Sequence, residues 1–198
     1  MHYNQTATAL PLPALLTQWQ VKQQTIAQSQ LWFFLLTATA VASNSIYYCT
    51  VPLVGFGVIA GSTLPRRKAI TVLLTMWLVN QLLGFTVRHY PWTFSTFAWG
   101  WVMGIGAVLA TLLVSVKPKF SQKRLSGHLL WLGTMLLTGY IFYELVIWLA
   151  GFALGAVEGF TLPILWGIFV GNAMWALALT LIHGIIAWRT SPGVPANL

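Results

Sequence analysis

The sequence contains no Asp, only two Glu and a single cysteine, Cys49. Catalysis by paired carboxylates would need Glu144 and Glu158 side by side, and no motif places them together. One cysteine cannot form an intrachain disulfide or a Cys-based metal cluster. Four scattered His residues show no metal-ligand spacing, and the usual hydrolase and phosphate-loop motifs are missing. The sequence therefore predicts a protein that is not an enzyme and holds neither a cofactor nor a metal.

Charged residues are also scarce, at 6% of the chain, while 58% is hydrophobic and the mean hydropathy is +0.76. An ordinary soluble domain has roughly a quarter of its residues charged. A chain of 198 residues cannot bury so much apolar surface in its own core, so membrane lipid must cover the rest. The apolar runs are continuous rather than alternating, which favours helices over a β-barrel. We expect an all-α, polytopic membrane domain over residues 31–188.

Six transmembrane helices are expected. The first two are short or partly re-entrant, because the 34 residues of Leu31–Leu64 are too few for two spans of about 20 residues. Pro52 marks the bend between them. Whether this segment crosses once, twice or turns back is left open. The predicted helices are Leu31–Ser43, Pro52–Ser62, Ala69–Val87, Phe94–Val116, His128–Leu149 and Leu162–Trp188.

Residues 1–30 form a polar N-terminal tail that includes a candidate interfacial helix around Ala14–Ile26, and residues 189–198 form a C-terminal tail. With six spans, nine of the ten Lys and Arg residues fall on one side of the membrane, and Arg88 alone falls on the other. The positive-inside rule then places both termini in the cytoplasm, whereas five spans would put the N-terminus outside. We expect a bacterial plasma (inner) membrane protein. Loop cations also explain the net charge of +8, so nucleic acid is not an expected partner.

Polar and aromatic residues gather in the outer half of the expected bundle. Asn80 and Asn172 lie at similar depth, and Glu144 is an ionisable group in an apolar helix, which normally pairs or binds something. We predict a ligand pocket open to the outside. Three alternatives are amide contacts that only join helices, an aromatic belt at the interface, and a structural Glu144–Arg88 ion pair. The candidate substrate-binding residues are Trp77, Asn80, Gln81, Arg88, His89, Tyr90, Tyr140, Tyr143, Glu144, Trp148 and Asn172.

Three stretches together resemble the substrate-binding S components of energy-coupling factor (ECF) transporters. They are the Pro-bounded apolar run Pro52–Gly61, the basic turn Pro65–Ala69 and the helix Met76–Phe85. The small pair Ala38 and Ala42 also agrees, because in that family small residues of the first helix contact the membrane-embedded T component.

The resemblance implies capture of a vitamin-like organic ligand, with cobalamin as one candidate. Transport would then depend on a T component and two cytosolic ATPase subunits. Two other readings stay open. One is a non-catalytic subunit or assembly factor of a larger membrane complex, and the other is a small stand-alone permease.

Overall fold

The computed structural model describes residues 18–47, 50–155 and 160–190. Within these ranges the chain is all-helical, as predicted, and the helix bounds differ from the expected ones by a few residues. A short helix, α6, lies inside the expected basic linker. The helices are α1 (Gln18–Gln28), α2 (Gln30–Ser43), α3 (Leu53–Thr63), α4 (Arg66–Thr86), α5 (Phe94–Val114), α6 (Lys119–Lys123), α7 (Leu125–Leu154) and α8 (Leu162–Arg189).

Four of the described helices, α4, α5, α7 and α8, are long and apolar enough to cross a membrane. The shortest of them has 21 residues, about 31 Å of helix, which matches a hydrocarbon layer of about 30 Å. α2 and α3 have 14 and 11 residues, or about 21 and 16 Å, so neither crosses alone. α1 and α2 are together apolar enough for a fifth span but bend by 65°. The first two predicted spans are thus short, as expected, and six crossings are not confirmed.

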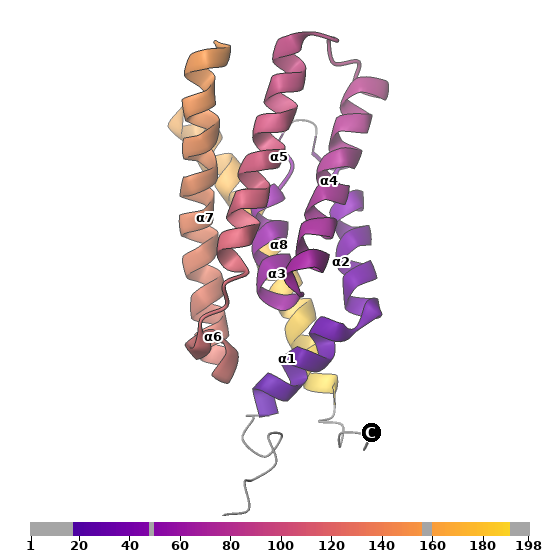
Figure 1. Cartoon of the computed structure of the whole chain (residues 1–198), viewed down its shortest axis with the longest axis vertical. Coiled ribbons are helices and arrows are strands. Elements are labelled where there is room, and N and C mark those ends of the chain that lie inside the picture. Colours follow the sequence, from indigo (N-terminus) through magenta and orange to yellow (C-terminus); the bar gives the residue numbers. More distant parts are fainter. Residues whose placement is uncertain (1–17, 48–49, 156–159, 191–198) are drawn as a thin grey trace, which may run out of the picture.

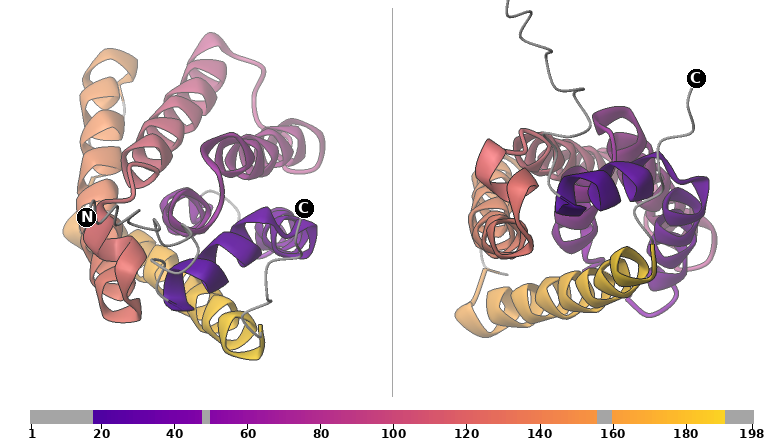
Figure 2. Two further views of the ribbon diagram at one scale, coloured as in Figure 1. Left: turned by 60° about the horizontal axis from the view of Figure 1, so that its bottom comes forward. Right: turned by 90° about the horizontal axis from the view of Figure 1, so that it is seen from below.

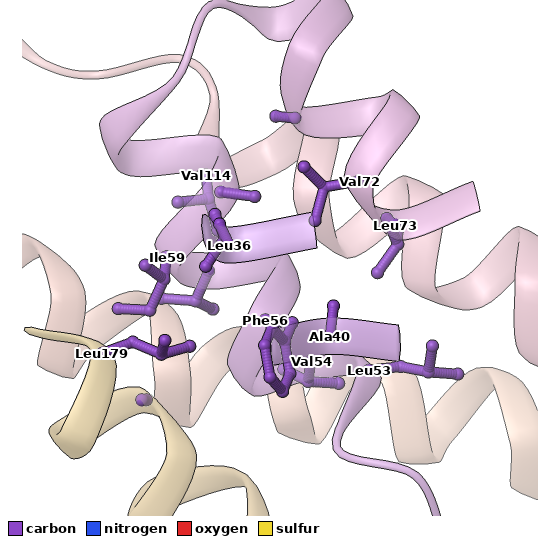
Figure 3. Close-up of a cluster of buried hydrophobic side chains, with 14 of the residues drawn as sticks. Leu36, Ala40, Leu53, Val54, Phe56, Ile59, Val72, Leu73, Val114 and Leu179 are labelled. Atoms are coloured by element: carbon purple, nitrogen blue, oxygen red, sulfur yellow. The ribbon is translucent and has the colours of Figure 1, made fainter. Parts of the chain in front are cut away.

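The short helix α3 is the centre of the bundle. Every residue from Leu53 to Thr63 is buried, and α3 contacts α1, α2, α4, α5, α7 and α8. Figure 2 shows it enclosed by the surrounding helices. Figure 3 shows Phe56 and Ile59 of α3 packed among side chains from neighbouring helices, such as Leu179. An apolar helix without a polar face is stable only when it is covered on all sides, and the sequence of α3 is of this kind.

Burying a short helix leaves its terminal N–H and C=O groups without water, which is tolerated only where protein groups pair them. The Gly55 N–H at the start of α3 donates to Asn172 Oδ1 at 2.8 Å. At the other end, Lys117 Nζ donates to the Leu64 carbonyl at 2.6 Å. Polar side chains from outside the α2–α3 hairpin therefore pair one backbone group at each end of α3.

The cations separate in space as the sequence predicts. α1, α6 and the C-terminal end of α8 lie together at one end of the bundle, and the α4–α5 connection lies at the other (Figure 1). Arg66 begins α4 at the end near α1, and Arg88 follows α4 at the opposite end. The structure thus keeps the charge asymmetry on which the expected orientation depends. The orientation itself, with both termini in the cytoplasm, stays a prediction, since the chain ends lie outside the described residues.

Lys117, in the α5–α6 connection, makes the stability of the fold depend on pH. Burial lowers its pKa from 10.5 to about 8. The folded chain therefore binds this proton less tightly than the unfolded chain, so the free energy of unfolding rises as pH increases from about 8 to 10.5. We expect a rise of about 1–2 kcal/mol, well below the full shift because Lys117 is partly solvated. Thermal unfolding in detergent between pH 7 and 10.5 should show this rise.

The matched comparison is between Lys117→Met and Lys119→Met, since Lys119 is an exposed cation two residues away. Lys119→Met should keep the alkaline rise in stability, and Lys117→Met should lose it. Equal pH slopes in the two variants would contradict this assignment.

Candidate functional site

A cavity of about 240 Å³ lies beyond the N-terminal end of α3 and is the main candidate site. It exists because α3 is short, so the larger helices α4, α5, α7 and α8 continue past its first residue and enclose a space there. Most of its wall is apolar, with polar groups at a few places. The lining residues are Thr50, Val51, Leu53, Val54, Asn80, Trp99, Met103, Tyr143, Glu144, Ile147, Phe160, Ile164, Leu165, Ile168 and Asn172.

Four of the predicted site residues meet in this cavity: Asn80, Tyr143, Glu144 and Asn172. At 1.5 Å per residue, Glu144 lies about 29 Å along α7 from Leu125, at the end of the bundle away from α1. Asn172 lies about 15 Å along α8 from Leu162. Both residues therefore lie at depths consistent with the outer half of the bundle, where the sequence predicts a pocket.

Asn172 links the cavity wall to the central helix. Its Oδ1 accepts the Gly55 N–H of α3 at 2.8 Å, and its Nδ2 donates to the Ile168 carbonyl of its own helix at 2.9 Å. The side chain is 2% exposed. Both ends of this amide are thus paired, so its first role is to hold the start of α3 against α8.

Arg88 does not line the cavity, but it fixes the turn that closes one side of it. Its guanidinium donates to Asn80 Oδ1 at 3.1 Å and to the backbone oxygens of Asn44 at 2.5 Å and Tyr47 at 2.7 Å. Asn44 is the C-terminal cap of α2. A cation at a helix C-terminus is favourable, because the last carbonyls carry partial negative charge. The α2–α3 turn is held further by a hydrogen bond of 3.1 Å from Trp175 Nε1 to the Tyr47 hydroxyl.

Glu144 and its aromatic neighbours lie on α7. The Tyr140 hydroxyl donates to the Leu165 carbonyl at 2.6 Å, which joins α7 to α8. Tyr143 and Glu144 face the cavity. Trp148, four residues after Glu144, is 39% exposed and its ring packs on Phe152 with centroids 4.6 Å apart. The candidate residues of α7 are therefore divided among a helix contact, the cavity and the outer surface.

Trp77 and Gln81 lie in a different place from the other predicted site residues. They line a groove of about 370 Å³ between α4 and α5, together with Phe85, Trp92 and Trp101 among others. Trp77 Nε1 donates to the Gly100 carbonyl at 2.7 Å. The structure does not bring these two residues together with Glu144.

His89 and Tyr90 lie in the turn that follows α4 and do not line the cavity. His89 has a φ of +54°, the left-handed geometry that often terminates a helix. The Tyr90 N–H then returns to the Gly84 carbonyl at 2.9 Å. The Tyr90 ring lies against Gly84, where a Cβ would come within 2.7 Å of it. Their position makes this turn compact enough for Arg88 to reach inward.

Ala38 and Ala42 are both exposed on α2. That face is open to lipid or to a partner helix, which is the geometry that a contact with another membrane subunit needs. Their role as partner contacts stays a prediction.

No group of three or more His, Cys, Asp or Glu side chains comes together among the described residues. His128 and His183 do pack together, with ring centroids 5.8 Å apart, near α1. Two imidazoles without a third ligand are a weak basis for a metal site.

Sequence reasoning missed the cavity residues that come from α5. Trp99 and Met103 line the cavity, and neither is among the candidate residues predicted from the sequence. The usable signal was their spacing: Trp99 and Met103 are four residues apart and therefore share a helix face. This face also carries Gly106 and Ala107, which are buried.

The fold and the cavity define an all-helical membrane protein with a partly polar chamber beyond a buried half-length helix. Comparisons with protein-family models, with curated proteins and with solved structures find no match for this chain. The resemblance to ECF S components therefore rests on the sequence patterns described above.

Proposed function

We propose that the protein is a substrate-capture subunit of a multi-component uptake transporter in a bacterial plasma membrane, of the kind that ECF S components represent. The observation that carries the proposal is the cavity of about 240 Å³ with Glu144 in its wall. A mostly apolar chamber with a few polar groups is the usual form of a small-molecule site. The expected ligand is a small organic molecule taken from the non-cytoplasmic side.

Two further features support capture rather than independent transport. The central helix α3 fills the bundle on the side of the cavity toward α1, since all of its residues are buried. A ligand in the cavity therefore meets a packed core instead of a continuous path. Ala38 and Ala42 offer an exposed small-residue face for a T component, whose ATPase partners would supply the energy.

The volume limits the ligand. At about 30 Å³ for each water molecule, 240 Å³ corresponds to about eight waters. This favours a molecule of one or two rings and disfavours cobalamin, whose corrin ring and nucleotide tail are much larger. Trp99 and Tyr143 in the wall suit a flat ligand.

The test is purification in detergent without added ligand, followed by mass spectrometry of the small molecules that remain bound. We expect one organic molecule at near-equal stoichiometry. Ile168→Trp, which fills the cavity, should reduce its retention at least 10-fold. Ile105→Trp is the matched control, because Ile105 is 53% exposed on α5.

Equal retention in wild type and Ile168→Trp would remove the cavity as the site. Purification with other membrane subunits and no small molecule would favour a structural subunit of a larger complex instead.

A further inference from the structure

Glu144 is the acidic side chain in the cavity wall. The cation expected beside it, Arg88, donates instead to Asn80 and to the carbonyls of the α2–α3 turn. The Tyr140 hydroxyl, which donates to the Leu165 carbonyl at 2.6 Å, is also a hydrogen-bonding neighbour of Glu144 but carries no positive charge. An ionisable side chain at this depth in a membrane protein normally faces a partner or a ligand.

Asn80 presents the opposite kind of group to the same cavity. Its side chain lines the chamber and is 4% exposed. Its Oδ1 accepts from Arg88 at 3.1 Å, which fixes the amide with its oxygen toward the guanidinium. The other end of the amide is the nitrogen, which carries two N–H donors. Asn172 also lines the cavity, but one N–H and one lone pair of its amide are already used within the protein.

The rest of the wall is apolar and aromatic. Trp99 and Met103 come from α5, and Ile147 and Ile168 come from α7 and α8. The face of a Trp ring attracts organic cations, and the attraction is stronger where water is excluded. Carboxylate, amide N–H donors and an aromatic wall therefore surround one chamber.

We propose that the captured ligand is a small organic cation. Its protonated amine faces Glu144, a hydrogen-bond acceptor faces the Asn80 amide nitrogen, and its ring or apolar body lies against Trp99 and Ile168. This deepens the proposed function and depends on it. An anionic ligand would meet the Glu144 carboxylate, and this like-charge contact disfavours it.

The test uses three related probes in calorimetric or NMR titrations of the purified full-length protein. They are 4-(aminomethyl)benzamide, its uncharged isostere 4-(hydroxymethyl)benzamide, and benzylamine, which lacks the amide acceptor. We expect wild type to bind the aminomethyl compound at least 10-fold more tightly than the hydroxymethyl compound. Glu144→Gln should reduce this ratio to about one. Benzylamine should bind wild type more weakly than 4-(aminomethyl)benzamide does. The two compounds should bind Asn80→Leu equally.

A ratio near one in wild type, or no binding of the aminomethyl compound, would overturn the proposal without any variant having to fold. A ratio that survives in Glu144→Gln would overturn it as well, as would identification of the retained ligand as neutral or anionic. In these cases the proposed function can still hold. It is supported if wild type retains a native ligand and Ile168→Trp loses it. If neither probes nor native ligand respond to Ile168→Trp, the proposed function fails too.

Discussion

Replacing Arg88 with Met is expected to cost about 3 kcal/mol or more of stability and to abolish ligand retention. The guanidinium pairs three acceptors at once, namely Asn80 Oδ1 and the backbone oxygens of Asn44 and Tyr47. Met cannot donate, so these part-buried oxygens would lose their partner, at about 1–3 kcal/mol for each oxygen that water does not reach. The α2–α3 turn would then loosen. Thr50 and Val51 of this connection line the cavity, so the ligand should be lost with it.

Thermal unfolding in detergent and mass spectrometry of bound ligand measure the two effects. Arg88→Lys should recover only part of the stability, because one ammonium group cannot span the acceptors that the planar guanidinium reaches. Arg67→Met is the control, since Arg67 is an exposed cation in the first turn of α4 at the opposite end. If Arg88→Met and Arg67→Met unfold alike, the guanidinium does not hold the turn.

The helices were predictable because their apolar runs are long and bounded by clear breaks. Pro52 and Pro65 separate α2, α3 and α4, and the basic linker separates α5 from α7. The shortness of the first two helices also followed from length alone. Their spatial relation did not, because it depends on Asn172, Arg88 and Lys117, which lie far along the chain and pair the buried helix ends.

The sequence predicted how deep the candidate residues lie along their helices, but only partly in which direction their side chains point. Asn80 and Gln81 lie at nearly the same height on α4, yet neighbouring residues on a helix point about 100° apart. Asn80 faces the cavity, and Gln81 faces the groove beside α5 together with Trp77, four residues earlier. One sequence shows which residues share a face. Which face meets the cavity is decided by the packing of α4 against α5.

The α7 residues show the same limit. Tyr140, Glu144 and Trp148 follow at intervals of four residues, and the facing direction turns by about 40° at each step because 3.6 residues complete a turn. Over two steps the stripe moves from the α8 contact at Tyr140, through the cavity at Glu144, to the exposed Trp148. A regular spacing therefore predicted neighbours correctly and overestimated how many of them share one site.

Gly55→Ala should show how closely the cavity depends on the contact between α3 and α8. A Cβ at Gly55 would come within 2.5 Å of the backbone oxygen of Asn172. The backbone of α8 cannot rotate away as a side chain could, so the two helices must separate. We expect a loss of about 2–3 kcal/mol in the free energy of unfolding, because overpacking of this kind exceeds the gain of about 1 kcal/mol from replacing a helical Gly with Ala. Ligand retention should fall as well, because the Gly55 N–H bond to Asn172 is broken.

Gly133→Ala separates this effect from helix propensity. Gly133 is also a helical glycine, on α7, and a Cβ there meets nothing within 4 Å. This variant should keep the ligand and gain up to about 1 kcal/mol. Unfolding measured on both variants in the same detergent therefore gives opposite signs if α3 is clamped against α8. A neutral or stabilising Gly55→Ala with full ligand retention would mean that the start of α3 is free to move, and that the cavity above it is not a fixed site.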